Sequence, residues 1–274
     1  MPENMKLRNR TAVVTGAASG IGRAIAISLA RRGCHLALAD LNEAGLAQTA
    51  ETAASPGVRI SRHRLDVADG SAVASFPAKV MAEHGRVDLL VNDAGVALGG
   101  TFEQVSETDF EWLFSINFWG VVRMTRAFLP QLRASDDARI VNLSSLYGLI
   151  SPPGQTAYSA SKFAVRGFTQ SLGHELKGSS IGVTVVHPGG VATAIARNAR
   201  LPKGIAEEEA RKRLAAVERF LRLPPERAGE IIVEGIERRK TRVLVGTDAK
   251  IMSVIERLLP VSHWNILRQL NRRA

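Results

Sequence analysis

A strand, a glycine-rich turn and a helix follow one another near the N-terminus, and this feature constrains the fold most. The apolar run Ala12-Val13-Val14 leads into Thr15-Gly16-Ala17-Ala18-Ser19-Gly20-Ile21-Gly22, and an Ala/Ile/Leu-rich segment follows to about Gly33. Gly16 would allow a tight turn, Gly20 a close approach of the backbone to a pyrophosphate, and Gly22 close helix packing. The spacing differs from the G-x-G-x-x-G dinucleotide motif, so a glycine turn that binds nothing is the alternative.

Short apolar strands alternate with helical patterns along the chain. The predicted strands cover residues 11–15, 35–39, 58–65, 87–91, 139–143, 181–187 and 242–245. This order is typical of an α/β fold with a doubly wound parallel sheet of the Rossmann type, in which right-handed crossovers bring functional groups to the carboxyl ends of the strands. Because 274 residues at 45% hydrophobic can bury one large core but hardly two, we expect a single domain over 1–274, with a core of about 8–247 and an extension over 248–274.

Asp40 ends the second predicted strand, eighteen residues after Gly22. A carboxylate there can accept hydrogen bonds from the adenosine ribose hydroxyls, which favours NAD. NADP is less favoured, because its 2′-phosphate would bring negative charge against Asp40 and neither Ser19 nor Leu41 supplies a compensating cation. The alternative is that Asp40 is only the N-cap of the helical segment that begins near Asn42.

Tyr158 and Lys162 are four residues apart in a helical pattern. This spacing places a phenol and an ammonium on one helix face. A tyrosine with a pKa of about 10 is a poor base near neutrality, but a neighbouring cation favours its phenolate. The pair is therefore a candidate acid/base device in which tyrosine carries the proton and lysine lowers its pKa. Many solvated helix faces carry the same pair, so the assignment depends on the rest of the chain.

Seven motifs occur along the chain in a fixed order. They are Thr15-Gly16-x-x-x-Gly20-x-Gly22, Asp66-Val67, Asn92-x-Ala94-Gly95, Asn117, Ser145, Tyr158-x-x-x-Lys162 and Pro188-Gly189-x-Val191-x-Thr193. With this series the chain resembles the compact, single-domain branch of the short-chain dehydrogenase/reductase family over roughly residues 8–247. Ser145 lies thirteen residues before Tyr158, and Asn117 twenty-eight before Ser145, which are the family's spacings for its catalytic serine and asparagine.

The resemblance implies an NAD(P)-dependent oxidoreductase with four catalytic residues. Tyr158 would be the general acid/base, and Lys162 would lower its pKa and hold the nicotinamide ribose. Ser145 would hydrogen-bond the substrate oxygen, and Asn117 would hold a water that links Lys162 to solvent. These residues would position the substrate and polarise its oxygen, while the cofactor supplies the hydride. Ser144, next to Ser145, is the other candidate for the catalytic serine, and the spacing favours Ser145.

The resemblance also implies how the cofactor is held. Thr193 and the backbone at Ile21 and Val191 would contact it, and Asp66-Val67 would lie at its adenine. The complete set of implied cofactor-binding positions is Gly16, Ser19, Gly20, Ile21, Gly22, Asp40, Asp66, Val67, Asn92, Ala94, Gly95, Tyr158, Lys162, Pro188, Gly189, Val191 and Thr193.

One position departs from the family pattern. The family most often has Asn-Asn-Ala-Gly where this chain has Asn92-Asp93-Ala94-Gly95. An extra carboxylate near the cofactor would cost stability if it were buried and unpaired.

Composition excludes several classes of site. There is no run of eighteen apolar residues and no apolar secretory segment after Met1, so we expect a cytoplasmic protein. Cys34 is the only cysteine and the six histidines lack metal-ligand spacing, so neither an internal disulfide nor a metal site is expected. His187, just before Pro188, is interpreted as structural, with a place near the active site as the alternative.

The segment from Ala194 to about Pro225 lies outside the shared core. It contains three consecutive glutamates at 207–209 and a basic helical pattern to Leu223. In the family this segment covers the substrate, so we expect a helical lid, with a rigid surface helix as the alternative. Apolar residues follow the motifs at Val96, Leu98, Leu146 and Tyr147, which predicts a pocket for a lipophilic secondary alcohol or ketone.

The C-terminal extension is basic and amphipathic. Residues 238–274 carry nine Lys/Arg against two acidic residues, a local balance of +7 in a chain of net charge +10. The apolar side of this helical pattern would pack on this subunit or on a neighbouring one. The alternative is that the extension makes a weak peripheral contact with an anionic membrane surface. Its apolar residues at helical spacing are Ile251, Val254, Ile255, Leu258, Leu259, Trp264, Ile266, Leu267 and Leu270.

Other functions and the assembly complete the expectations. The alternatives to a dehydrogenase are an epimerase or dehydratase of the same superfamily and a non-catalytic nucleotide-binding scaffold at a membrane surface. No nucleic-acid partner is expected, because no recognition helix or RNA-binding aromatic motif accompanies the arginines. The segment from Phe110 to Leu132 and the helix carrying Tyr158 have more apolar surface than one sheet face covers. We therefore expect a homo-oligomer, a dimer or tetramer.

Overall fold

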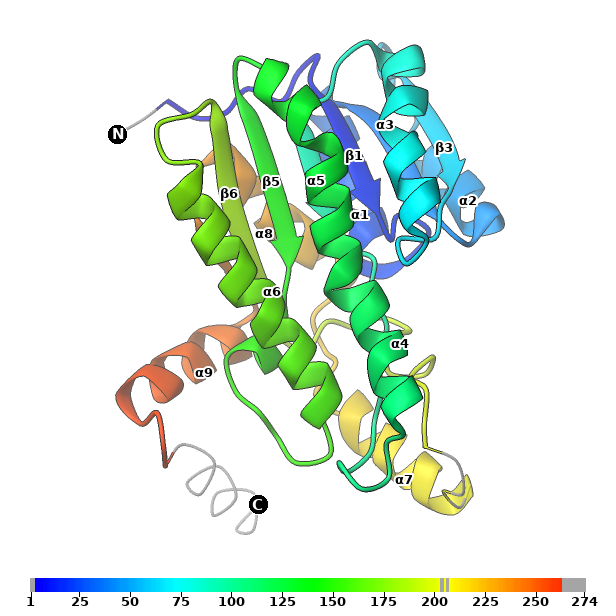
Figure 1. Cartoon of the computed structure of the whole chain (residues 1–274), viewed down its shortest axis with the longest axis vertical. Helices are drawn as coiled ribbons and strands as arrows, with labels where there is room; N and C mark the ends of the chain where they lie inside the picture. The colour runs from blue at the N-terminus through cyan, green and yellow to red at the C-terminus, as the bar shows by residue number, and fades with distance from the viewer. Residues whose placement is uncertain (1–2, 203–204, 206, 263–274) are drawn as a thin grey trace.

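The computed structural model describes residues 3–202, 205 and 207–262 (Figure 1). Within these residues, seven parallel strands form one sheet in the order β3-β2-β1-β4-β5-β6-β7. The order reverses between β1 and β4, which makes the sheet doubly wound and confirms the predicted fold class. The strands are β1 Thr11–Thr15, β2 His35–Asp40, β3 Ile60–Arg64, β4 Leu89–Asn92, β5 Ala138–Leu143, β6 Ile181–Pro188 and β7 Arg242–Val245.

Helices cover both faces of the sheet (Figure 1). One face is packed by α1 (Gly20–Arg31), α2 (Glu43–Ala53) and α8 (Pro225–Glu237). The other is packed by α3 (Gly70–His84), α5 (Trp119–Ala134) and α6 (Thr156–Glu175). The elements beyond the sheet faces are α4 (Glu107–Asn117), a short 3-10 turn (Leu146–Gly148), α7 (Glu207–Glu218) and α9 (Thr247–Leu258).

Burial on both faces explains the composition of the strands. Every residue of β1, β4 and β5 is buried, so these central strands are nearly continuous apolar runs. Behind the sheet, α1 and α8 approach closely, because a Cβ on Gly229 would lie only 2.6 Å from the carbonyl carbon of Ala24. This packing holds α1, and with it the glycine turn, against the sheet.

A buried row of polar side chains ties the carboxyl ends of the central strands together. The Asn92 amide donates to Asn142 Oδ1 (2.8 Å), and the Asn142 amide donates to Thr169 Oγ1 (3.0 Å). Asn92 therefore points into the sheet and supports the strand end below the expected cofactor position, so a contact with the cofactor would have to come from its backbone.

The first turns of the C-terminal extension belong to the core. The Asp248 carboxylate accepts a hydrogen bond from the Gly190 N–H (2.6 Å), and Ala249 and Ser253 are buried. The expected boundary at residue 248 thus falls inside α9. The predicted apolar residues Trp264, Ile266, Leu267 and Leu270 lie outside the described residues. Among the helices that are described, none combines the length and apolar character needed to span a membrane.

Candidate active site

The glycine turn has the backbone that the sequence predicted. Gly16 and Gly20 have φ values of +69° and +54°, in the left-handed region that glycine adopts without steric cost. A Cβ on Gly22 would lie 2.3 Å from the Gly16 carbonyl oxygen. Gly22 therefore permits close packing of the helix start on its own turn.

The Pro-Gly segment after β6 forms the opposite wall. A Cβ on Gly20 would lie 3.1 Å from Thr193 Cγ2, so the two motifs face each other. Val191 is buried and pairs with Leu223, and the Gly190 carbonyl accepts from the Leu223 N–H (3.0 Å). The predicted end of the basic helix at Leu223 is therefore wrong. Helix α7 ends at Glu218, and Leu223 lies in an extended segment that pairs with the wall.

Asp40 is bonded to the glycine turn. Its carboxylate accepts from the backbone N–H of Ala18 (3.1 Å) and of Asn42 (3.0 Å). The N-cap of α2 is Asn42, whose side chain accepts from the Gly45 N–H, so the alternative interpretation of Asp40 as that cap does not hold. Asp40 thus lies at the end of β2 beside the turn, where an adenosine ribose would reach it.

The residues expected at the adenine lie after β3. The Asp66 carboxylate accepts from the Ala68 N–H (2.8 Å). Val67 is buried against Gly120, where an added Cβ would lie 2.8 Å from Val67 Cγ2. These contacts fix the loop at the side of the sheet where Asp40 also lies.

Tyr158, Ser145 and Lys162 converge beside the end of β5. The Ser145 hydroxyl faces the Tyr158 phenol and accepts from the Tyr147 N–H (3.1 Å). Lys162 Nζ lies 5.7 Å from the centroid of the Tyr158 ring and donates to the Leu143 carbonyl (3.2 Å). Both Tyr158 and Lys162 are buried on the inner side of α6. The predicted spacing therefore brings all three groups to one place.

The protonation of this group differs from the sequence-based expectation. Burial raises the pKa of Tyr158 to about 12, and the Ser145 hydroxyl opposes this rise only in part. Burial lowers the pKa of Lys162 to about 8, against the attraction of Asp93. Desolvation dominates the pKa of Tyr158, because a phenolate needs solvation that the enclosed site does not give, and Lys162 is not among the groups that shift it. Tyr158 is a neutral phenol at neutral pH.

The two adjacent serines have different partners. The Ser144 hydroxyl donates to the Lys162 carbonyl in α6 (2.9 Å), whereas Ser145 faces Tyr158. His187 is fully buried, and its Nδ1 lies 2.9 Å from the Ser145 carbonyl oxygen. Of the two serines, Ser145 is the one whose side chain faces Tyr158, and its catalytic role stays a prediction; His187 supports the backbone of Ser145 from the neighbouring strand.

Asn117 ends α4 and is fully buried. Its amide donates to the Val96 carbonyl (3.0 Å) and accepts from the Val96 N–H (2.8 Å). A Cβ on Gly95 would lie 3.2 Å from Asn117 Oδ1 and 3.4 Å from Lys162 Nζ. Asn117 therefore holds the segment after Ala94 next to Lys162, and the implied water contact stays a prediction.

An apolar cluster covers the catalytic group. Around Tyr158 it contains Leu98, Leu113 and Ala157, with Val96, Ala97, Val105, Phe110, Trp112 and Tyr147 packed against it. Leu146, which the sequence also placed there, is not part of this cluster. The Tyr147 ring meets the Tyr158 ring edge to face at 6.1 Å between centroids.

The segment after Thr193 is fastened over this cluster. The Arg200 guanidinium lies 3.6 Å from the centre of the Trp112 ring and donates to Asp109 Oδ1 (2.8 Å). The Gly99 N–H donates to the Arg200 carbonyl (3.1 Å). These contacts link the segment to α4, and neither they nor the bond between Asp248 and Gly190 had a signal in local sequence spacing.

The residues present fit a dinucleotide. The left-handed glycines form the turn before α1, Thr193 faces Gly20, Asp40 accepts from the turn at Ala18, and Lys162 Nζ lies beside Gly95. Nicotinamide would lie toward Tyr158 and Lys162 and adenosine toward Asp40. Among the residues that the structure describes, no group of three or more His, Cys, Asp or Glu side chains could hold a metal ion.

Comparisons with known proteins agree with this geometry. The short chain dehydrogenase family profile matches residues 10–204. Oxidoreductase SadH of Mycobacterium tuberculosis is 43% identical over 261 residues, which cover 94% of each chain. Oxidoreductase UcpA of Escherichia coli is 39% identical over 194 residues, covering 70% of this chain and 73% of that protein.

Solved structures give the same result. A short-chain dehydrogenase/reductase from Burkholderia phymatum, solved in complex with NAD, superposes with a TM-score of 0.84 at 31% identity and covers 97% of this chain and 96% of that one. The likeness extends over sequence and fold. The chain therefore belongs to the short-chain dehydrogenase family and is an oxidoreductase of the short-chain dehydrogenase/reductase type.

Proposed function

We propose that the protein transfers a hydride between NAD and a lipophilic secondary alcohol or ketone, with Tyr158 as the general acid/base. The observation that carries the proposal is the convergence of Ser145, Tyr158 and Lys162 beneath an apolar cluster. When bound, the nicotinamide supplies or accepts the hydride. The protein residues bind, orient and exchange the proton.

The proton chemistry follows from the geometry. A substrate carbonyl would accept hydrogen bonds from Ser145 and Tyr158, and the neutral phenol would give up its proton as negative charge develops on the oxygen. Lys162 stays cationic below its pKa of about 8 and stabilises the phenolate that forms. In the alcohol-oxidising direction the same groups act in reverse, with the phenolate as base.

The choice of NAD rests on Asp40. Its carboxylate lies beside the glycine turn, and the adjacent Leu41 is apolar and 52% exposed. A 2′-phosphate would meet negative charge at this position. The NAD complex of the Burkholderia phymatum relative is consistent with this choice.

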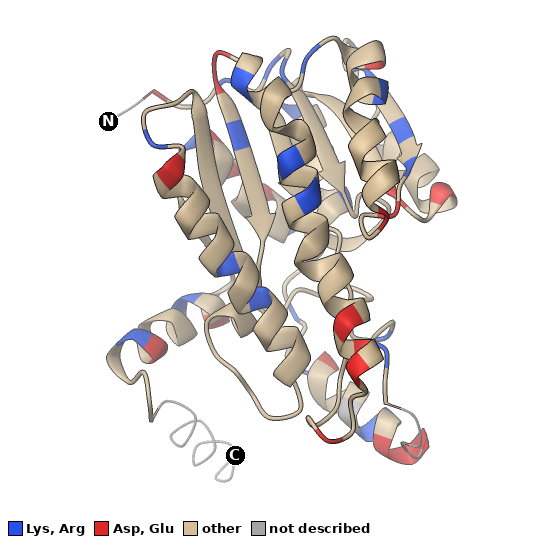
Figure 2. Cartoon of the chain, in the orientation of Figure 1, with Lys and Arg blue, Asp and Glu red and all other residues tan. Residues whose placement is uncertain are grey.

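The substrate class rests on the surroundings of Tyr158. The cluster around it is apolar, and Figure 2 shows acidic residues on α4 and both acidic and basic residues on α7. An apolar pocket favours a lipophilic substrate. We propose that residues 194–224 act as the lid of this pocket.

The decisive test is a screen of lipophilic secondary alcohols with NAD and of the matching ketones with NADH, followed by nicotinamide absorbance. The proposal expects turnover of at least one pair, lost in Tyr158→Phe. Turnover of phosphorylated sugars alone, or equal turnover by the Tyr158→Phe variant, would contradict it. Epimerisation or dehydration without net change of nicotinamide absorbance would instead favour the alternative activities.

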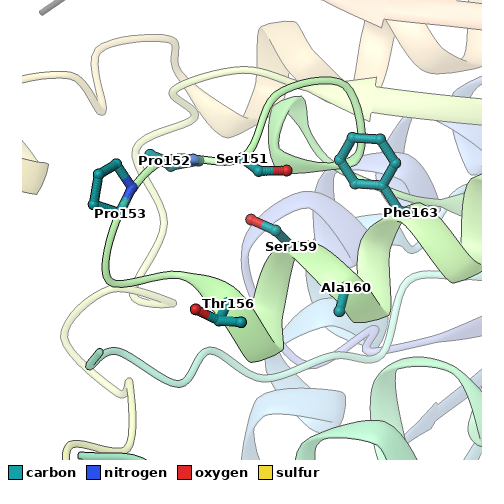
Figure 3. Close-up of a pocket in the computed structure, with 7 residues that line it drawn as sticks. All are labelled: Ser151, Pro152, Pro153, Thr156, Ser159, Ala160 and Phe163. Carbon is teal, nitrogen blue, oxygen red and sulfur yellow. The ribbon is translucent and has the colours of Figure 1, made fainter. Parts of the chain in front are cut away.

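We also propose a homo-oligomer built on α5 and α6. Trp119 is 49% exposed, and a groove on this face is lined by residues that include Phe118 and Phe168. A second groove, lined by Ser151, Pro152, Pro153, Thr156, Ser159, Ala160 and Phe163, lies at the start of α6 (Figure 3). A two-fold partner would cover these apolar surfaces. Light scattering that shows a monomer at micromolar concentration would refute this assembly.

The exposed face of α9 is the remaining candidate contact. Ile251, Val254 and Leu258 are 50%, 57% and 71% exposed and lie along one side of the helix. We propose that this row makes a subunit contact or a weak contact with anionic lipid. Because Asp248 is bonded to the core, the suitable variant keeps α9 and replaces Val254 and Leu258 by serine; binding to anionic vesicles that survives this change would refute a lipid contact through the row. The cytoplasmic location stays a prediction.

A further inference from the structure

The side chain of Asp93 points at the start of α1. Its backbone N–H donates to Thr15 Oγ1 (3.1 Å), which fixes the residue after β4. A Cβ on Gly22 would lie 2.7 Å from Asp93 Oδ2, and the Gly22 N–H donates to the carboxylate. The carboxylate therefore occupies the first turn of α1, where a helix N-terminus favours an anion.

Charged and titratable groups from two other elements face this carboxylate, and the neighbouring Arg23 is turned away from it. Lys162 on α6 attracts it, and Asp40 at the end of β2 repels it. Tyr158, also on α6, feels its charge but titrates far above neutrality, with a pKa of about 12. Arg23, the neighbour of Gly22 in α1, is turned to α2, where its Nε donates to Thr49 Oγ1 (2.9 Å).

The balance of these interactions places Asp93 between two protonation states. Burial is the largest effect and raises the pKa of Asp93 to about 7, while Lys162 and the Gly22 N–H oppose the rise. Near neutral pH both the neutral acid and the carboxylate are populated. The two forms differ by one negative charge at the start of α1.

We propose that Asp93 is a specificity-determining residue of the dinucleotide site, which binds the dinucleotide tightly when the Asp93 carboxyl is protonated and weakly when it is ionised. The inference rests on the proposed dinucleotide function. A pyrophosphate would be held at the α1 N-terminus, where an ionised Asp93 also lies. The two anions would be close together and partly dehydrated, so they would repel each other.

The sign of the pH effect follows by linkage. Because a bound anion favours the neutral acid, binding raises the pKa of Asp93 and takes up a proton. Affinity is then highest below pH 7 and falls as the pH rises through the pKa of the free protein. If binding raises that pKa by about one unit, the dissociation constant at pH 8.0 is about fivefold above its low-pH limit.

The test compares the unmodified protein with Asp93→Asn, which keeps a hydrogen-bond acceptor toward Gly22 but cannot ionise. NADH binding is measured by nicotinamide fluorescence between pH 6.0 and 8.0. We expect dissociation constants within about twofold of each other at pH 6.0, and about fivefold tighter binding by Asp93→Asn at pH 8.0. Asp93→Asn also removes the attraction that keeps Lys162 protonated, so Lys162 loses its proton more easily in the variant. This change would weaken NADH binding by the variant and so cannot produce the tighter binding expected at pH 8.0.

Two controls make the outcome specific. Glu43→Gln removes an exposed carboxylate in the first turn of α2 and should bind NADH as the unmodified protein does at both pH values. Equal binding by Asp93→Asn and the unmodified protein at pH 8.0, or the same gain in Glu43→Gln, would overturn the inference. Absence of NADH binding in every protein at every pH would instead refute the dinucleotide function. If Asp93→Asn fails a thermal-unfolding check, Asp93→Ser replaces it in the same comparison.

Discussion

Ser144 and Ser145 give the sharpest discrimination between a structural and a catalytic side chain. The two residues are adjacent at the end of β5, yet Ser144 donates to the Lys162 carbonyl and Ser145 faces the Tyr158 phenol. Replacing each by alanine removes one hydroxyl and adds no bulk. We expect Ser145→Ala to lose activity, and Ser144→Ala to lose stability while it keeps its activity.

The magnitudes follow from what each hydroxyl contacts. Ser144 makes a buried bond of 2.9 Å between neutral groups, so its loss should cost about 1 kcal/mol of unfolding free energy, a fall in Tm of about 2–4 °C. Ser145 would donate to a substrate oxygen that gains negative charge, and removal of such a donor typically lowers kcat by about 100-fold to 1000-fold. The two effects fall on different observables, so they can be separated.

The assay is steady-state kinetics on the alcohol or ketone identified in the screen, together with thermal unfolding of each variant. Ser144→Ala should keep kcat within a few fold while its Tm falls. Ser145→Ala should keep its NADH affinity, and its Tm should fall by an amount similar to that of Ser144→Ala, because the Ser145 hydroxyl also accepts from the Tyr147 N–H (3.1 Å). The assignment would be refuted if Ser144→Ala lost as much kcat as Ser145→Ala while still folded, because then the hydroxyl at 144 would be the one that acts on the substrate.

Three further outcomes are expected. Asp40→Ala with Leu41→Arg should shift preference from NAD toward NADP, since it removes a repelling carboxylate and adds a phosphate partner; tighter binding of NADPH than NADH by the unmodified protein would contradict the role of Asp40. Lys162→Ala should lower both NADH affinity and kcat, measured by fluorescence titration and single-turnover kinetics. Burial lowers the pKa of His84 to about 4, so the folded state binds fewer protons than the unfolded chain between about pH 6.5 and pH 4. The free energy of unfolding therefore falls as the pH drops through that window, by up to roughly 3 kcal/mol from this group. Urea unfolding at pH 7 and pH 5 checks this, and a pH effect that is as large in His84→Gln would contradict it.

Local spacing predicted the parts of the site that local geometry determines. The glycine turn requires positive φ at Gly16 and Gly20, and the four-residue separation of Tyr158 and Lys162 on α6 requires a common helix face. The alternation of strands and helices was sufficient to predict the parallel sheet, because right-handed crossovers leave few other arrangements of the strands. The functional residues on different strands then meet at one edge.

Contacts between distant segments could not be predicted in the same way. Asp248 reaches Gly190 across 58 positions, and His187 supports Ser145 across 42. Neither pair has a periodic or motif signal. The protonation of Tyr158 was also out of reach, because its pKa depends on how completely the fold excludes solvent, and the sequence showed only that a lysine would be near.

The most direct measurement of the central claim is single-turnover kinetics of Tyr158→Phe beside its NADH affinity. Phenylalanine keeps the ring that packs against Tyr147 and removes only the hydroxyl that exchanges the proton. The account predicts that the chemical step is nearly abolished while the dissociation constant for NADH changes by no more than a few fold. A correctly folded Tyr158→Phe protein that turns over substrate at a substantial fraction of the unmodified rate would contradict it.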